Sequence, residues 1–388
     1  MGRTIPCDVA IVGGGLAGGL IALALKAKRP DCDVRVVESG AAFGGDHVWS
    51  FFGSDVVGAD RWLVAPLVVH GWRGYDVAFP HLRRQVDATY YSLTSERLDA
   101  VLRARLPADA LMTGRKVLAA SATAVVLADG DRIAAKGVID ARGPGDLATL
   151  DLGWQKFVGQ ELALAEPHGA NGPTVMDATV AQLDGYRFVY CLPFAERRMF
   201  VEDTYYSDTP DLDGGAIGAR IADYAAARGW QVEGIARGEA GVLPITLGGD
   251  FDAYWRSTGG QIAKAGMRAG LFQPATGYSL PDAVRLAVRI AGLADLGGRG
   301  LAQFTRDYAA AAWKRGAFYR MLSAMMFRAG DPAERWRIIE RFYRLDPMLI
   351  TRFYAGRSTI LDKARILTGK PPVPVGAAIR VLRTTDWR

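Results

Sequence analysis

The hydrophobic pattern at the start of the chain predicts a strand, a helix and a second strand. Cys7–Val12 is apolar enough for a buried strand, Leu16–Lys28 has the length of a helix, and Val34–Glu38 predicts a further strand. Two parallel strands joined by a helix form a βαβ unit. The uncharged stretch from Val9 to Leu25 contains five glycines, too many for a stable transmembrane helix, and no small-residue cleavage site follows it. We therefore expect neither an export signal nor a membrane span.

The glycines of this turn have the spacing of a dinucleotide site. Gly13, Gly15 and Gly18 form the pattern G-x-G-x-x-G between the predicted strand and the helix. They permit a tight turn and let the helix N-terminus approach a pyrophosphate, whose charge the helix dipole stabilises. Glu38 follows Gly18 by twenty residues, the distance at which a carboxylate meets an adenosine ribose. Strand, glycines, helix, strand and acid in this order predict a bound dinucleotide.

Further helices and strands follow the βαβ unit. Ser92 or Thr94 caps a predicted helix that runs to about Leu106. The loop Asp140–Pro144 either turns its acid and glycine toward the cofactor or is an ordinary strand end, and both interpretations stay open. Ser279 is placed to cap a later helix, whose N-terminus suits an anionic group. The other predicted elements are strands at Val117–Leu127 and Arg132–Ile139 and helices at Ala216–Gly229 and Leu280–Ala294. Gly241–Ile245 is expected to lead back toward the first lobe.

Aromatic-rich strands fill the middle of the chain. Trp154–Gly159, Tyr186–Pro193 and Met199–Glu202 are short apolar runs separated by turn residues. They predict an antiparallel sheet that forms a second lobe over the cofactor. A chain of 388 residues, half of them hydrophobic and 23% charged, is long enough for two folded lobes.

Cysteine and histidine are scarce. Cys7, Cys32 and Cys191 have neither metal-ligand nor C-x-x-C spacing, and the four histidines form no H-x-x-x-H or H-E-x-x-H pattern. We expect buried, reduced thiols in a cytoplasmic protein and no metal site.

The positive charge of the chain is concentrated at its C-terminal end. From Trp313 to Arg388 there are 16 Lys and Arg against 6 Asp and Glu, so the first 312 residues carry 31 against 35. Aromatic and Met residues are interleaved with these arginines on predicted helices. Such helices either lie on anionic lipid or pack on their own domain. We expect membrane contact, and no nucleic acid because no nucleic-acid module accompanies the charge. One face holds Trp336, Ile339 and Tyr343, and another holds Arg337, Arg341 and Arg344.

Four segments of this chain resemble the bacterial lycopene β-cyclases, which are flavoproteins of carotenoid biosynthesis. They are Gly44–Phe51, Tyr190–Phe194, Phe200–Tyr206 and Gly266–Pro281. The likeness runs along the whole chain in order. Gly266-Met267 stands where many related flavin monooxygenases have Gly-Asp, which favours the cyclases. Asp46 stands where the family often has Asn, and the role of that position stays open.

The resemblance implies an α/β fold in three parts: a glutathione-reductase-type, Rossmann-like FAD-binding domain, an antiparallel-sheet substrate lobe and a helical C-terminal region. We expect residues 1–70, 91–150 and 241–312 in the FAD-binding domain, 71–90 and 151–240 in the substrate lobe, and 313–388 in a basic region that contacts the membrane. The family uses reduced FAD, for which NAD(P)H is the expected reductant, although no electrons leave the flavin overall. The expected FAD contacts are Gly13, Gly15, Gly18, Glu38 and Arg97, with Gly266 and Gly277 at the isoalloxazine.

The implied reaction converts the linear ends of lycopene to β-ionone rings without net redox change. It needs a proton on a terminal alkene carbon, ring closure through a tertiary carbocation, and loss of a ring proton. A carboxyl group with an ordinary pKa of about 4.3 is ionised at neutral pH, but burial raises that pKa. The family's essential glutamate falls on Glu202, beside Phe200. We assign Glu202 as the general acid and Asp203 as a secondary acid or partner, with a solvated strand-end acid as the alternative for Asp203.

Stabilisation of the carbocation has two expected sources. An anionic reduced flavin would supply negative charge, and it is also an alternative carrier of the proton. Aromatic faces of Trp49, Phe51 or Tyr190 would add cation–π stabilisation, although core packing is the more frequent role of such residues.

Two other functions share these sequence features. An FAD-dependent hydroxylase or prenyl-chain reductase of the same fold would oxidise NAD(P)H in proportion to its product. A membrane-bound flavin carrier would tolerate loss of Glu202. For the cyclase, we expect a cytoplasmic protein on the inner face of the cytoplasmic membrane that takes its carotenoid from the bilayer. Neither the number of ends that are cyclised nor an oligomeric state is predicted.

Overall fold

A largely parallel sheet organises the first part of the molecule. The computed structural model describes residues 2–369 and 371–385. The strand order is β8-β2-β1-β11-β10-β9, with β17 beside β11, and the pairs of β1 with β2 and with β11 are parallel. The carboxyl ends of β1 and β2 therefore open on the same edge, next to the glycine turn. The strands are β1 (Thr4–Val12), β2 (Val34–Val37), β8 (Leu111–Met112), β9 (Val117–Ala120), β10 (Ala124–Leu127), β11 (Arg132–Asp140) and β17 (Ala263–Lys264).

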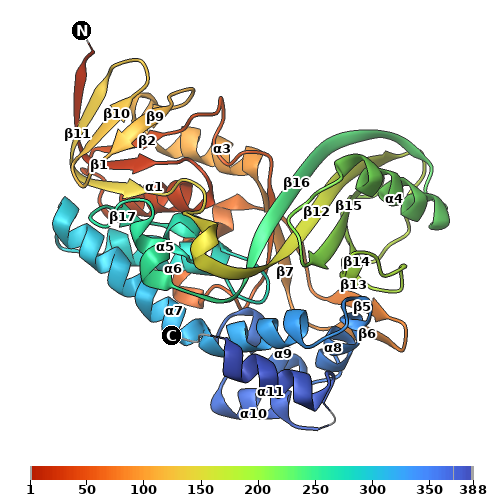
Figure 1. Ribbon diagram of the computed structural model, residues 1–388. Helices are drawn as coiled ribbons and strands as arrows, with labels where there is room; N and C mark the ends of the chain where they lie inside the picture. Colours follow the sequence, from red (N-terminus) through yellow and green to blue (C-terminus); the bar gives the residue numbers. More distant parts are fainter. Residues whose placement is uncertain (1, 370, 386–388) are drawn as a thin grey trace.

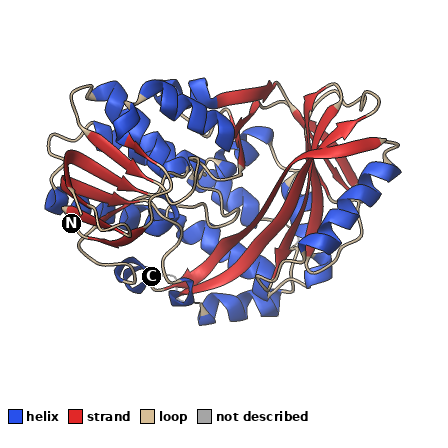
Figure 2. Ribbon diagram, turned by 90° about the horizontal axis from the view of Figure 1, so that it is seen from above, coloured by secondary structure: helices blue, strands red, loops and turns tan. Residues whose placement is uncertain are grey.

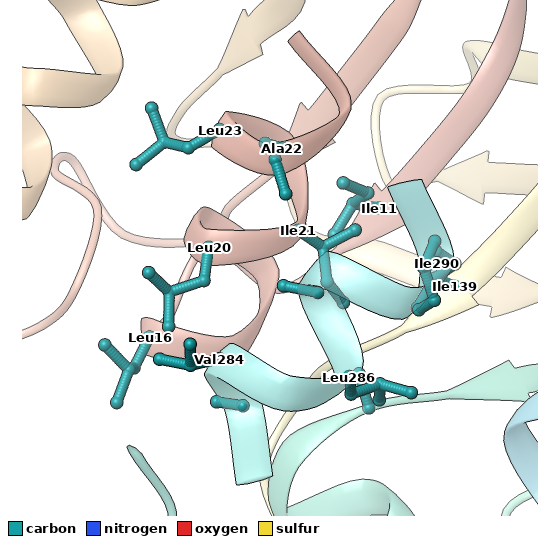
Figure 3. Packing of buried hydrophobic residues seen from close by; sticks show 14 of the residues in the cluster. Ile11, Leu16, Leu20, Ile21, Ala22, Leu23, Ile139, Val284, Leu286 and Ile290 are labelled. Carbon is teal, nitrogen blue, oxygen red and sulfur yellow. The ribbon is translucent and has the colours of Figure 1, made fainter. Parts of the chain in front are cut away.

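Helix α1 (Leu16–Lys28) has the predicted bounds and is buried along most of its length. Its apolar side chains form one core with those of α6 (Leu280–Ala291), and Figure 3 shows Leu20 of α1 near Val284 of α6. The first turn of the helix lies so close to the glycine turn that a Cβ at Gly18 would be 2.0 Å from the carbonyl oxygen of Gly13. Glycine at position 18 thus sets the distance between the helix and the turn.

A second sheet forms the other lobe, with the order β16-β12-β15-β14-β13-β5-β6. All of its pairs are antiparallel except β13 with β5. In Figure 1 the long strands β12 and β16 arch away from the parallel sheet, and Figure 2 shows the same curved strands from above. The strands are β5 (Tyr75–Phe79), β6 (Leu82–Val86), β12 (Leu150–Leu164), β13 (Thr174–Asp177), β14 (Tyr186–Ala195), β15 (Arg198–Ser207) and β16 (Val232–Gly249).

The two faces of this sheet have different neighbours. Helix α4 (Gly214–Ala227) packs on one face, where Val201 and Tyr205 contact Ile217 and Ile221 in a common core. The other face carries aromatic residues and lines a cavity. A small sheet, ordered β3-β7-β4, joins the lobes through β3 (Val48–Phe52), β4 (Val68–Trp72) and β7 (Tyr90–Thr94).

The C-terminal region is helical, as predicted, but Trp336 and Tyr343 face inward. Trp336 is buried and Tyr343 is fully buried, both in the core that also holds the aromatic residues of the second sheet. Trp336 and Tyr343 therefore pack on the domain itself, which is the alternative expected for such residues, and contact of the C-terminal region with a membrane stays a prediction. The helices are α7 (Gly298–Arg328), α8 (Trp336–Phe342), α9 (Pro347–Tyr354), α10 (Ile360–Leu367) and α11 (Val375–Thr384).

The other predicted elements differ from the structure in detail. Helix α3 (Ser95–Arg105) is capped by Thr94, whose side chain accepts a hydrogen bond from the Arg97 backbone. Ser279 precedes α6 but makes no side-chain capping bond. Helix α2 (Arg61–Val64) and α5 (Phe251–Arg256) complete the set of α-helices in the described chain. Strand β16 runs across the expected domain boundary after residue 240. Within the described residues, no helix has both the length and the apolar character needed to cross a membrane.

The predicted fold class is confirmed: a Rossmann-like α/β part carries the glycine turn, an antiparallel sheet forms the second lobe, and helices end the described chain.

Candidate active site

A cavity of about 660 Å³ lies between the parallel sheet and the aromatic face of the second sheet. At one end it is lined by Gly13, Gly15 and Glu38, and at the other by Tyr190 and Glu202. The cavity thus joins the predicted nucleotide site to the predicted acid, although these residues are up to 189 positions apart in the sequence.

The nucleotide end of the cavity is shaped by backbone that only glycine tolerates. Gly13 has φ +101°, and a Cβ there would lie 2.8 Å from the backbone of Ala141. A Cβ at Gly15 would meet no atom within 4 Å, so this position opens on the cavity, where the N-terminus of α1 is also exposed. Helix α1 has no acidic residue in its first turn. The turn therefore offers an uncrowded, electropositive surface of the kind that binds a pyrophosphate.

The Glu38 side chain faces the same end of the cavity. Its Oε2 accepts a hydrogen bond from the Gly14 N–H at 2.8 Å, and its Oε1 accepts one from the Gly40 N–H at 2.8 Å. These bonds fix the carboxylate beside the glycine turn. Arg142 and Gly143 also line the cavity, whereas the buried Asp140 is turned to Arg142, whose Nε lies 2.9 Å away. Each of the two interpretations of this loop therefore holds in part, because Gly143 faces the cavity and Asp140 does not.

Two further glycines border the middle of the cavity. Gly266 has φ +57°, and a Cβ there would lie 2.8 Å from the Cβ of Ala17. Gly277 has φ +67°, and a Cβ there would lie 2.9 Å from the Cβ of Leu243. Both positions need glycine for conformation and for space. Gly13, Gly15, Gly266 and Gly277 all line the cavity, and the part that they border is called the channel below.

The structure does not bring Arg97 to this channel. Its side chain is exposed, and its Nε donates a hydrogen bond to the carbonyl oxygen of Pro66 at 2.8 Å. The helix that carries it was predicted correctly, but the side chain points to the segment before β4 rather than to the cavity.

Glu202 lies on β15, on the cavity face of the second sheet. Because side chains alternate along a strand, Phe200 and Tyr206 share its face. Tyr190 lies directly opposite Glu202 on β14. The Oγ1 of Thr204 donates a hydrogen bond to Oε1 of Glu202 at 2.6 Å. The carboxyl is therefore held on an aromatic wall, with its position fixed from its own strand.

The surroundings of Glu202 favour its protonated form. Burial in the aromatic wall and, next, the negative charge of Glu239 raise the pKa of Glu202 from 4.5 to about 8, against the opposing hydrogen bond from Thr204. A carboxyl group in this state carries its proton at neutral pH, as a general acid requires.

Asp203 points to the opposite face of the sheet. It is fully buried and forms a bidentate ion pair with Arg187, whose Nε lies 2.8 Å from Oδ1 and whose second nitrogen lies 2.9 Å from Oδ2. The Tyr205 hydroxyl donates a further bond to it at 2.8 Å. Asp203 is thus neither solvated nor placed at the cavity. The strand alternation separates the two adjacent acids.

Aromatic side chains provide most of the remaining wall around Glu202. Trp49, Phe51 and Tyr190, which were proposed from the sequence to face a cation, all line the cavity. The Tyr190 hydroxyl is 2.8 Å from that of Tyr90, so its polar end is paired while its ring faces the interior. Such faces stabilise positive charge.

Sequence reasoning missed two acids near this wall. Asp55 lines the cavity and is almost completely buried, and its Oδ1 has no hydrogen-bond partner in the structure. Burial raises the pKa of Asp55 to about 7. Glu239 lies on β16 close to Glu202. The signal for both was an acid within an apolar or small-residue run, Ser54-Asp55-Val56 and Gly238-Glu239-Ala240, which did not by itself indicate a site.

Comparison with known proteins assigns the chain to a family. The family model described as lycopene cyclase protein matches residues 8–380. The chain belongs to the lycopene cyclase family. It is 47% identical over 374 residues to the lycopene beta-cyclase of Pseudescherichia vulneris, covering 96% of each chain. It is 44% identical over 378 residues to the lycopene beta-cyclase of Pantoea ananas, covering 97% of this chain and 98% of the other. These relatives do not favour the hydroxylase or prenyl-chain reductase alternative.

Similar solved structures support the fold. A geranylgeranyl bacteriochlorophyll reductase-like protein from Thermoplasma acidophilum aligns with a TM-score of 0.56 at 12% identity, covering 98% of this chain and 97% of the other. A flavin-dependent brominase aligns with a TM-score of 0.57 at 12% identity, covering 93% and 97%. At this identity the likeness establishes the shared architecture.

Proposed function

We propose that this protein cyclises the linear ends of lycopene to β-ionone rings, by way of γ-carotene to β-carotene, with Glu202 as the general acid. The observation that carries the proposal is the position of the Glu202 carboxyl on the aromatic wall of the same cavity that the glycine turn lines, where burial raises its pKa to about 8. Nearly full-length relatives named lycopene beta-cyclase support the substrate and the reaction.

The proposed chemistry is a sequence of proton and electron-pair movements. Glu202 transfers its proton to a terminal alkene carbon, and the electron pair of that double bond forms the new C–H bond. The resulting tertiary cation is attacked by a second double bond, which closes the ring. Return of a ring proton to the Glu202 carboxylate then restores both the neutral hydrocarbon and the acid, so no oxidant or reductant is consumed. The rings of Trp49, Phe51 and Tyr190 border the space in which this charge develops.

The channel fits FAD, the cofactor that we propose for this family member. Gly13, Gly15 and Glu38 would hold its pyrophosphate and ribose, Gly18 would keep α1 close to them, and Gly266 and Gly277 would border its ring system. When bound and reduced, for which NAD(P)H is the proposed reductant, FAD supplies negative charge near the carbocation.

The assignment is tested with lycopene in liposomes, incubated anaerobically with full-length protein, FAD and a reductant. The native protein should give β-carotene of unchanged mass, and only with reduced flavin. Glu202→Gln should abolish ring formation while FAD stays bound, and Glu233→Gln, an exposed change on β16, should not. Retained cyclisation in Glu202→Gln would contradict the role of this residue. A product altered in mass by oxygen or hydrogen would contradict the reaction.

We further propose that the C-terminal helices rest on the inner face of the cytoplasmic membrane. Since Trp336 and Tyr343 are buried, the contact is made by exposed aliphatic residues, with Ile360 at 85% and Leu361 at 81% exposure at the start of α10. Arg357 and Arg365 are exposed beside them and complement anionic lipid. Tyr354, at the end of α9 and six residues before Ile360, lines the cavity, so a short segment connects this surface to the space where a membrane-dissolved carotenoid would bind.

Sedimentation with anionic liposomes tests this contact. The double variant Ile360→Ser/Leu361→Ser should lose most of its lipid binding, and binding of the native protein should weaken as salt is raised. Leu118→Ser is the matched control, because Leu118 is 62% exposed on β9, on the parallel sheet. Equal binding of both variants would contradict the assigned surface.

A further inference from the structure

Glu202 has an acidic neighbour that lies two strands away. Strand β12 runs between β15 and β16, and its Gly159 pairs with Glu202 on one side and with Glu239 on the other. All three positions are therefore in register across the sheet. Gly159 contributes no side chain between the two carboxyls, and a Cβ there would lie 3.2 Å from Cγ of Glu239 and 2.5 Å from Cζ of Phe200. The glycine lets the two carboxyl groups meet across the middle strand.

The contacts of Glu239 suit a carboxylate. Its side chain is 2% exposed, and its Oε2 accepts a hydrogen bond from the Val48 N–H at 2.7 Å. The Nδ1 of His47 lies 3.8 Å from the same oxygen, and the pKa of His47 is raised mainly by this neighbour. The nearby Arg237 is directed elsewhere, with its Nε 2.9 Å from Glu96. Hydrogen bonds and positive charge stabilise the ionised form of a buried acid.

Glu202 has the opposite surroundings. Besides Thr204 and Glu239, its polar neighbours are the buried phenols of Tyr90, Tyr190 and Tyr206. The charge of Asp203 also acts on it, although that side chain points to the other face of the sheet. Two carboxyl groups that meet in a poorly solvated place do not both ionise readily, because like charges repel strongly there. The proton shared between such a pair remains on the member with fewer partners for its charge.

We propose that Glu239 is a positioning residue of the cyclisation: as a carboxylate fixed by Val48 and His47, it holds the catalytic proton on Glu202. The inference rests on the proposed role of Glu202 as the acid. Once the proton has moved to the alkene, Glu202 and Glu239 are both negatively charged, and their charge stabilises the carbocation. The side chain of His47, which is 43% exposed and also lines the cavity, connects the pair to solvent.

The test is the pH profile of cyclisation by the full-length protein with reduced FAD and lycopene liposomes. Glu239→Gln keeps an oxygen for the Val48 N–H but removes the negative charge, so Glu202 should lose its proton at lower pH. We expect the alkaline limb of the profile to move down by about one pH unit or more, which is about a tenfold loss of rate above that limb. At pH 5.5 the variant should approach the native rate. Glu233→Gln, on the same strand but exposed, should leave the limb in place.

A second measurement does not depend on turnover. The infrared band of the protonated Glu202 carboxyl, identified by its absence in Glu202→Gln, should titrate at lower pH in Glu239→Gln than in the native protein. An unmoved band, or a loss of rate that is equal at every pH, would overturn the proposal. If the Glu202→Gln variant still cyclised lycopene, the proposed acid would be wrong, whereas an unmoved band with an inactive Glu202→Gln variant would refute only the role of Glu239.

Discussion

Replacing Glu202 by glutamine should change how the stability of the protein depends on pH. Glutamine has nearly the same shape, but it cannot ionise. In the unfolded chain the carboxyl releases its proton near pH 4.5, whereas in the folded protein it keeps the proton until about pH 8. Between these values the folded state binds more protons than the unfolded state, so the free energy of unfolding must fall as pH rises.

The size of the effect follows from the same two values. At pH 7 a group with a pKa of about 8 is about nine-tenths protonated, whereas one with a pKa of 4.5 is about 0.3% protonated. Between pH 4.5 and pH 8 the folded state binds up to one proton more than the unfolded state. The free energy of unfolding should therefore fall by at most about 1.4 kcal/mol for each pH unit. The native protein should show this slope and Glu202→Gln should lack it. The stability of the variant relative to the native protein should therefore increase as the pH rises from 5 to 8.

Urea unfolding of the two proteins at several pH values measures this difference directly. Above pH 8 both states of the native protein have lost the proton, and the difference should become constant. Glu233→Gln controls for removal of an exposed acid on the same sheet and should follow the native curve. A difference that is flat from pH 5 to pH 8 would refute the argument, because Glu202 would then be ionised in the folded protein like any surface carboxyl. A change of sign would mean that the folded protein stabilises its charge.

Three other substitutions test separate features of the structure. Gly13→Ala forces a methyl group onto a backbone with φ +101°, and flavin affinity measured by fluorescence should fall about tenfold or more. Asp203→Asn leaves the buried charge of Arg187 without its partner, so the free energy of unfolding should fall by about 3–5 kcal/mol in urea titrations, and unchanged stability would contradict the ion pair. Gly159→Ala places a Cβ 2.5 Å from Phe200, and a loss of about 1–3 kcal/mol in the same assay is expected; a neutral result would show that the wall adapts.

The nucleotide part of the fold could be predicted because its information is local. A strand, a glycine turn and a helix succeed one another within the first 28 residues, and the structure follows that order with α1 at the predicted bounds. The sequence does not predict which residues approach each glycine in the folded chain. Gly266 and Gly277 are needed because Ala17 and Leu243 approach them from distant segments, and such approaches exist only in the folded chain.

The positions of the acidic side chains also could not be predicted fully from the sequence. Glu202 and Asp203 are adjacent in sequence and similar in chemistry, and only the alternation of side chains in β15 sends one to the cavity and the other to Arg187. The alternation predicts that the two acids differ, but not which of the two faces is the cavity. Glu239 could not be found from the sequence, since its closeness to Glu202 depends on the register of two strand pairs.

The basic C-terminal region illustrates why composition is a weak guide to placement. Aromatic residues beside arginines are typical both of an interfacial helix and of a packed one, and here burial assigns Trp336 and Tyr343 to the core. The aliphatic pair at Ile360 and Leu361 remains exposed, close in sequence to Tyr354, which lines the cavity. A lipid surface at this pair would let the same helical layer close one side of the cavity and face the bilayer. A carotenoid could then pass from lipid to the aromatic wall without its length crossing water, where exposure of apolar surface costs about 25 cal/mol for each Å².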